Sequence, residues 1–189
     1  MTKNIEFFYD VVSPWSYLAW TQIEKVAERQ QANLQYRPFL LGGVFKITHN
    51  QAPMTVPAKG AHMLIDLKRW ADRYRVAFNM PGNFPVSSLL AMRCLTALET
   101  KDIPLATEKL FTAFWVKGED ISERYTLIDL LGENILQKAN HDFTKEKLKV
   151  TTNEAVKRGA FGAPTFFVGD EMFFGSDRLE MLENHLQSL

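Results

Sequence analysis

The sequence predicts an α/β fold in which both ends of the chain build one mixed sheet and an all-helical segment is inserted between them. Residues 4–9 and 34–39 are strand-like runs on either side of an amphipathic stretch at residues 14–31. Near the other end, residues 165–168 and 171–174 flank Gly169-Asp170, a turn signal for a β-hairpin. The two ends can share a sheet only if the residues between them form an insertion.

The remaining elements follow from local signals. Pro14 suits the first position of a helix, where its missing N–H costs nothing. Residues 41–57 contain Gly42-Gly43 and two prolines, which predict an ordered loop. Apolar residues at helical spacing predict helices at residues 59–75, 88–99, 104–116, 126–134 and 144–158. Residues 177–180 resemble a capping box that opens a last helix.

Composition and charge exclude several classes of function. The 189 residues are 46% hydrophobic, and 22 basic residues balance 22 acidic ones. A neutral chain without a basic run gives no electrostatic reason to bind nucleic acid or an anionic membrane. The single Cys94 excludes an intrachain disulfide, and neither a signal peptide nor an apolar run of about 20 residues is visible. We therefore expect a cytoplasmic protein that binds no nucleic acid and no membrane.

The segment Ser13-Pro14-Trp15-Ser16 stands where a thioredoxin-like redox enzyme carries Cys-x-x-Cys. Pro164 precedes a predicted strand, as the cis-proline that faces this motif does in such folds. These features predict a thioredoxin-like fold, with a discontinuous domain at residues 1–44 and 159–189 and a helical insertion domain at residues 45–158. Because the chain lacks the thiol pair, the sulfur must arrive on a ligand, and glutathione is the candidate.

Ser13 is the candidate catalytic residue. The start of a helix has unpaired N–H groups and a positive dipole end, which favour a thiolate. A serine hydroxyl can donate a hydrogen bond to that thiolate and lower the pKa of the ligand's thiol. The alternative is that Ser13 is only an N-cap. Its pairing with the Pro164 loop favours the role in ligand activation.

Further candidates lie in three other segments. The backbone of Ala163, before Pro164, can pair with an extended peptide such as glutathione. Ser176 and Asp177 can bind the carboxylate and the ammonium of a γ-glutamyl group. Lys59 lies at a predicted helix start, where its positive charge is unfavourable beside the positive end of the helix dipole. An anionic partner would explain a lysine at this position. A plain turn, a capping pair and a solvated lysine are the respective alternatives.

Aromatic side chains predict a wall for a flat substrate, with core packing as the alternative: Trp15, Phe84, Trp115, Phe173 and Phe174. Cys94 lies between apolar residues of a predicted helix and is expected to be an inert core thiol. The four histidines have no metal-ligand spacing and no Cys/His cluster exists, so the sequence predicts no metal site.

Six motifs spread over the chain carry a family resemblance: FYDVVSPWSY at residues 8–17, RPFLLGG at 37–43, PAKG at 57–60, DLKRWA at 66–71, GAFGAPT at 159–165 and FGSDRL at 174–179. The chain resembles the 2-hydroxychromene-2-carboxylate isomerases, which are relatives of the kappa-class glutathione transferases within the DsbA-like branch of the thioredoxin superfamily. The resemblance covers essentially the whole chain.

The resemblance implies that Ser13 activates glutathione, the cofactor, and that Asn50 and Lys59 contact its glycyl end. It further implies that Ala163 pairs with its backbone, while Ser176 and Asp177 bind its γ-glutamyl end. The reaction implied is the isomerisation of 2-hydroxychromene-2-carboxylate, or a related unsaturated aromatic carboxylate, by reversible addition of the glutathione thiolate. A homodimer is also implied.

One segment departs from the family pattern. Residues 83–88 read NFPVSS, without the Tyr and Arg expected to contact the aromatic acid, and no Arg follows until Arg93. The specific substrate therefore stays open. Two alternatives remain: a kappa-like transferase that forms stable conjugates, and a non-catalytic DsbA-like peptide-binding protein, which the missing cysteines suggest.

Overall fold

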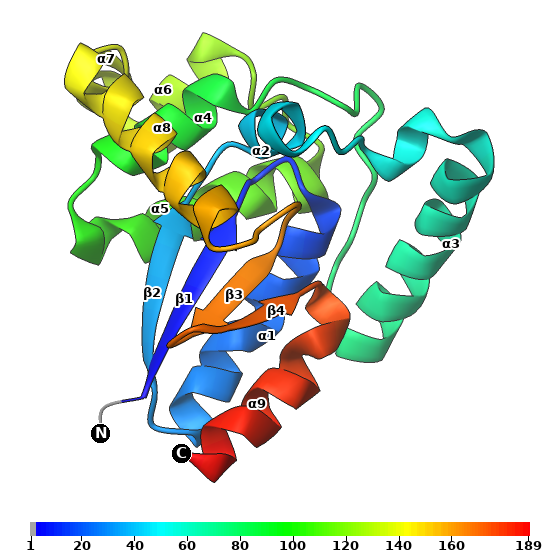
Figure 1. Ribbon diagram of the computed structural model, residues 1–189. Coiled ribbons are helices and arrows are strands. Elements are labelled where there is room, and N and C mark those ends of the chain that lie inside the picture. Colours follow the sequence, from blue (N-terminus) through cyan, green and yellow to red (C-terminus); the bar gives the residue numbers. More distant parts are fainter. Residues whose placement is uncertain (1–2) are drawn as a thin grey trace.

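A computed structural model describes residues 3–189 and contains one four-stranded mixed sheet (Figure 1). Its strand order is β2-β1-β3-β4, with β1 Asn4–Tyr9, β2 Asn33–Pro38, β3 Thr165–Val168 and β4 Glu171–Phe174. β1 is parallel to β2 and antiparallel to β3, and β3 pairs antiparallel with β4. Strands from both ends of the chain lie side by side, which confirms the predicted thioredoxin-like fold.

Helices fill the chain between β2 and β3. The bounds in this region are α2 Leu41–Thr48, α3 Pro57–Tyr74, α4 Leu89–Ala97, α5 Ile103–Thr112, the π-helical turn η3 Ala113–Lys117, α6 Arg124–Leu131, α7 Glu133–Ala139 and α8 Asp142–Lys157. The domain boundaries at residues 44/45 and 158/159 stay a prediction, and residues 1–2 of the predicted first domain lie outside the described residues.

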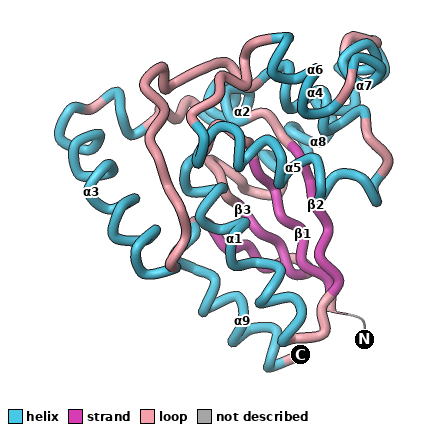
Figure 2. Tube along the Cα trace, turned by 180° about the vertical axis from the view of Figure 1, so that it is seen from behind, coloured by secondary structure: helices cyan, strands magenta, loops and turns pink. Residues whose placement is uncertain are grey.

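The sheet is covered on both faces. α1 (Pro14–Arg29) and α9 (Leu179–Ser188) lie on one face, and α2 and α8 lie towards the other (Figures 1 and 2). Because side chains alternate along a strand, Phe7 and Tyr9 of β1 join the core with α1, whereas Phe8 packs with Phe167 and with Ala155 of α8. β1 is therefore buried on both faces. This packing fixes the end of the strand, from which a short loop leads to Ser13 at the start of α1.

The predicted loop at residues 41–57 was wrong in its first half, which forms the helix α2. Gly42-Gly43 favours a loop by propensity, but tertiary packing overrides it. A Cβ on Gly43 would lie 3.2 Å from the Thr152 side chain of α8, so the glycine permits close contact between the two helices. Val44 is completely buried in this contact.

Two further predictions need correction. The single helix predicted at residues 126–134 is divided into α6 and α7 at Gly132, whose φ of +90° suits glycine. The predicted capping box is absent: the short 3₁₀ turn η4 (Ser176–Arg178) precedes α9, whose N-cap makes no side-chain hydrogen bond. The Asp177 carboxylate instead pairs with its neighbour Arg178.

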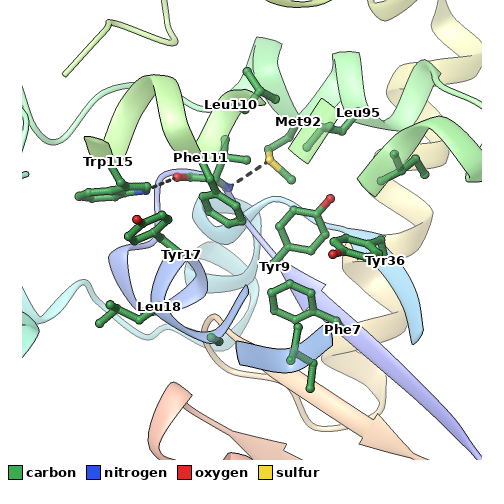
Figure 3. Packing of buried hydrophobic residues seen from close by; sticks show 14 of the residues in the cluster. Phe7, Tyr9, Tyr17, Leu18, Tyr36, Met92, Leu95, Leu110, Phe111 and Trp115 are labelled. Carbon is green, nitrogen blue, oxygen red and sulfur yellow. Dashed lines mark hydrogen bonds between the residues drawn. The ribbon is translucent and has the colours of Figure 1, made fainter. Parts of the chain in front are cut away.

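The inserted helices share one core with the sheet and α1. The indole N–H of Trp115 donates to the Val11 carbonyl over 2.8 Å (Figure 3). The Tyr9 and Thr107 hydroxyls are hydrogen-bonded at 2.5 Å between β1 and α5, and both residues are fully buried. These contacts hold the end of β1 against the inserted helices, so the following loop is positioned from both parts of the fold.

We predict that Tyr9→Phe destabilises the protein by about 1–3 kcal/mol, because the buried Thr107 hydroxyl loses its partner. The double variant Tyr9→Phe/Thr107→Val removes both polar groups and should recover most of that loss. Denaturant unfolding of the three proteins measures both effects. A double variant that is at least as unstable as Tyr9→Phe alone would contradict this interpretation.

Candidate functional site

A cavity of about 940 Å³ lies at the start of α1. Its walls come from the β1–α1 loop, the segment from α2 to α3, residues 84–89, the loop before β3 and the turn η4. The cavity lining includes all but one of the predicted site residues: Ser13, Asn50, Lys59, Ala163, Ser176 and Asp177. Pro164 is not among the lining residues, but its bond to Ala163 is cis, as predicted.

Ser13 is buried, and its hydroxyl makes two hydrogen bonds. Its Oγ accepts a hydrogen bond from the Ser16 N–H at 3.1 Å, so the residue is the N-cap of α1. The same hydroxyl donates to the Ala163 carbonyl at 3.1 Å, which joins the start of α1 to the cis-proline loop. Its proton therefore points at the backbone group that the sequence predicts to pair with a peptide.

Asp10 does not line the cavity but is hydrogen-bonded to three residues that do, and sequence reasoning missed it. Its carboxylate is completely buried and accepts hydrogen bonds from the Val12 N–H (3.1 Å), the Leu41 N–H (2.8 Å) and the Ser88 hydroxyl (2.9 Å). Burial raises the pKa of Asp10 from 3.8 to about 6, although these three hydrogen bonds act in the opposite direction. The bond to Val12, two residues on, is an Asx turn, a local signal that was available in the sequence.

Ser176 and Asp177 face the cavity from the opposite end of the site. Ser176 is 2% exposed, and among residues 3–189 its Oγ has no hydrogen-bond partner. The preceding Gly175 has φ +104°, and a Cβ there would lie 2.5 Å from an Asp177 carboxylate oxygen. The positive φ favours glycine at position 175. The Ser176 hydroxyl is a buried polar group without a partner in the described chain, and such a group is normally hydrogen-bonded.

Asn50 and Lys59 lie on the third wall. The Asn50 side-chain amide donates to the Phe161 carbonyl at 2.9 Å, which ties the α2–α3 segment to the cis-proline loop. Lys59 lies in the first turn of α3, is exposed, and forms no ion pair or hydrogen bond within the described chain. Its ammonium group is free to bind an anion.

The aromatic wall is only partly as predicted. Trp15, Phe84 and Phe174 line the cavity, whereas Trp115 is a core residue. Phe173 also does not line the cavity, since its ring contacts His185. Phe161, which the sequence prediction missed, lies with its ring centroid 4.3 Å from that of Phe174 at the cavity edge.

Three further predictions concern Cys94, metal binding and the membrane. Cys94 is buried in the core, and burial raises the pKa of its thiol to about 12, as expected for an inert residue. Within residues 3–189, no three His, Cys, Asp or Glu side chains are placed to hold a metal ion. None of the described helices is long and apolar enough to span a membrane.

In this structure the N-terminus of α1 faces a cis-proline loop, and a helical segment is inserted between β2 and β3. Residues 4–187 match the model of the DSBA-like thioredoxin domain. The chain belongs to this family. Because Ser13 and Ser16 replace both cysteines of the motif, this DSBA-like domain lacks a dithiol of its own.

Relatives of this DSBA-like protein include enzymes of two kinds. The chain is 31% identical to the glutathione S-transferase kappa 1 of Rattus norvegicus, covering 95% of this chain and 89% of the relative. It is 30% identical to the 2-hydroxychromene-2-carboxylate isomerase of Sphingobium xenophagum, covering 98% and 99%. A solved 2-hydroxychromene-2-carboxylate isomerase superposes with a TM-score of 0.86 at 26% identity, covering 98% and 95%.

The raised pKa of Asp10 has a measurable consequence for stability. A folded-state pKa of about 6, above the unfolded value of 3.8, means that the native state binds this proton more tightly than the unfolded chain does. The stabilising contribution is fully present below about pH 3.8 and is lost as the pH rises through about 6.

We therefore predict that the unfolding free energy of the wild type, relative to that of Asp10→Asn, falls by about 2–3 kcal/mol between pH 4 and pH 7. Denaturant unfolding at a series of pH values measures both curves. Parallel curves would show that Asp10 does not titrate in this range.

Proposed function

We propose that this protein is a glutathione-dependent enzyme that activates the glutathione thiol at Ser13 and isomerises an unsaturated carbonyl compound, such as 2-hydroxychromene-2-carboxylate or a related aromatic unsaturated carboxylate. One observation carries the proposal: the Ser13 hydroxyl, at the helix start, is hydrogen-bonded to the Ala163 carbonyl in the cis-proline loop. The names of the relatives, an isomerase and a glutathione transferase, support the same class of reaction.

The residues around the cavity fit glutathione by their chemistry. Lys59 is a free cation for the glycyl carboxylate, with Asn50 beside it in the same wall. Ala163 offers backbone groups to the cysteinyl residue. The buried Ser176 hydroxyl, which has no partner within residues 3–189, and the Asp177 carboxylate match the carboxylate and ammonium of the γ-glutamyl group.

In this proposal each group of the protein has a defined task. Bound glutathione supplies a thiolate that adds to an unsaturated carbon and leaves after bond rotation. When glutathione binds, the Ser13 hydroxyl turns its single proton from the Ala163 carbonyl to the sulfur, which leaves that carbonyl to the peptide. The positive end of the α1 dipole favours the negative charge on the sulfur. The walls at Trp15 and Phe84 exclude water and hold the second substrate in place. The proposal also includes that the protein is a homodimer and is located in the cytoplasm.

A kappa-like transferase that forms stable conjugates is the second candidate. The basic residues among those that line the cavity are His49 and Lys59, and the wall at residues 84–89 has no cationic side chain. If Lys59 binds glutathione, few cations remain for a second carboxylate. This observation favours an uncharged electrophile, and hence conjugation, over an aromatic acid.

We predict that Ser13→Ala lowers glutathione-dependent turnover about 10- to 100-fold, because a hydrogen bond to a charged sulfur is lost. Ser16→Ala is the matched control, since Ser16 is a buried serine of the same helical turn that does not line the cavity. Initial rates with both variants test this. Equal rates for Ser13→Ala and the wild type would remove Ser13 from the mechanism.

The fate of glutathione separates the two candidate reactions. The wild-type protein and glutathione are mixed with an unsaturated aromatic pyruvate and, in a separate reaction, with an uncharged aryl halide. The concentration of free thiol is then measured over many turnovers. Unchanged thiol with isomerised product supports the isomerase. Thiol consumed in proportion to product supports the transferase, and no turnover of either compound contradicts both.

A further inference from the structure

The turn that carries Ser176 and Asp177 is fixed by hydrogen bonds from two directions. From the sheet side, the Gly175 N–H donates to the Pro164 carbonyl at 3.0 Å. From the helical insertion, the Tyr74 hydroxyl donates to the Ser176 carbonyl at 3.0 Å. The second bond comes from a different wall of the cavity, so the position of the turn depends on α3 as well as on the sheet.

Tyr74 links α3 to the turn that carries Ser176 and Asp177. It lies in the last turn of the helix whose first turn carries Lys59, about 22 Å away along the axis. Its ring contacts Trp70, with 5.3 Å between ring centroids, and Trp70 lines the cavity. Burial, and to a lesser degree the charge of Asp177, raises the pKa of Tyr74, so the phenol remains a hydrogen-bond donor at neutral pH.

We propose that Tyr74 is a positioning residue for the γ-glutamyl end of glutathione: its hydroxyl ties the Ser176–Asp177 turn to α3 and so fixes where that turn lies at the cavity wall. This inference rests on the proposed function. Without the hydroxyl, the turn keeps its bond to Pro164 but loses its tie to the helix that carries Lys59. Loss of the hydroxyl should weaken the contacts to the γ-glutamyl group. The contacts at Ser13 and Ala163 should be kept, because neither residue is hydrogen-bonded to Tyr74.

The test uses Tyr74→Phe, which removes one hydroxyl and keeps the ring contact with Trp70. Calorimetric titrations measure the affinity for glutathione and, by competition, for cysteinylglycine, which lacks the γ-glutamyl group. We expect about three- to ten-fold weaker binding of glutathione and a change of less than about two-fold for cysteinylglycine. Tyr125→Phe, at a residue that is 82% exposed, is the control and should bind both thiols as the wild type does.

Three results would overturn the inference. Unchanged glutathione affinity in Tyr74→Phe, with wild-type binding intact, would mean that the hydroxyl does not position the turn. Equal weakening for both thiols would make Tyr74 a general part of the scaffold. If the wild type binds no glutathione, the proposed function fails first, and this inference falls with it.

Discussion

The carboxylate of Asp10 is completely buried just after β1, where it accepts hydrogen bonds from the Val12 and Leu41 N–H groups and from the Ser88 hydroxyl. An unpaired buried carboxylate is costly, so the fold is stable only when donors converge on it. These donors come from the β1–α1 loop, the start of α2 and the segment before α4. One side chain thus links three segments that line the cavity beside Ser13.

The same region shows why a serine can replace a cysteine in this scaffold. Ser13 uses both properties of a hydroxyl, accepting from Ser16 as a helix cap and donating to the Ala163 carbonyl. A thiol is a weak donor and acceptor and would do neither well. The hydroxyl therefore joins the helix start to the cis-proline loop, whereas the chain's own thiol, Cys94, lies buried in the core.

The fold was largely predictable because its signals are local. Alternating strands, the Gly169-Asp170 turn and Pro14 at the helix start each act within a few residues. The α2 helix escaped prediction because its stability comes from packing against α8, which lies over 100 residues away. Propensity alone assigns Gly42-Gly43 to a loop.

The sequence indicated which residues could form the candidate site, but not the hydrogen bonds between them. That Ser13 and Ala163 meet across 150 positions was inferred from two motifs, and their hydrogen bond is a property of the folded chain. Tyr74 bonds Ser176 over 102 positions, and neither residue type nor spacing signals it. Asp10 was overlooked because its partners at Leu41 and Ser88 lie 31 and 78 positions away.

The most direct test of the account is the ionisation of bound glutathione, followed by the ultraviolet absorbance of its thiolate as the pH is raised. The wild type should lower the pKa of the bound thiol below that of free glutathione, and Ser13→Ala should return it most of the way. A bound thiol that titrates as it does in water, or that has the same lowered pKa in both proteins, would contradict the assignment of Ser13 as the activating residue.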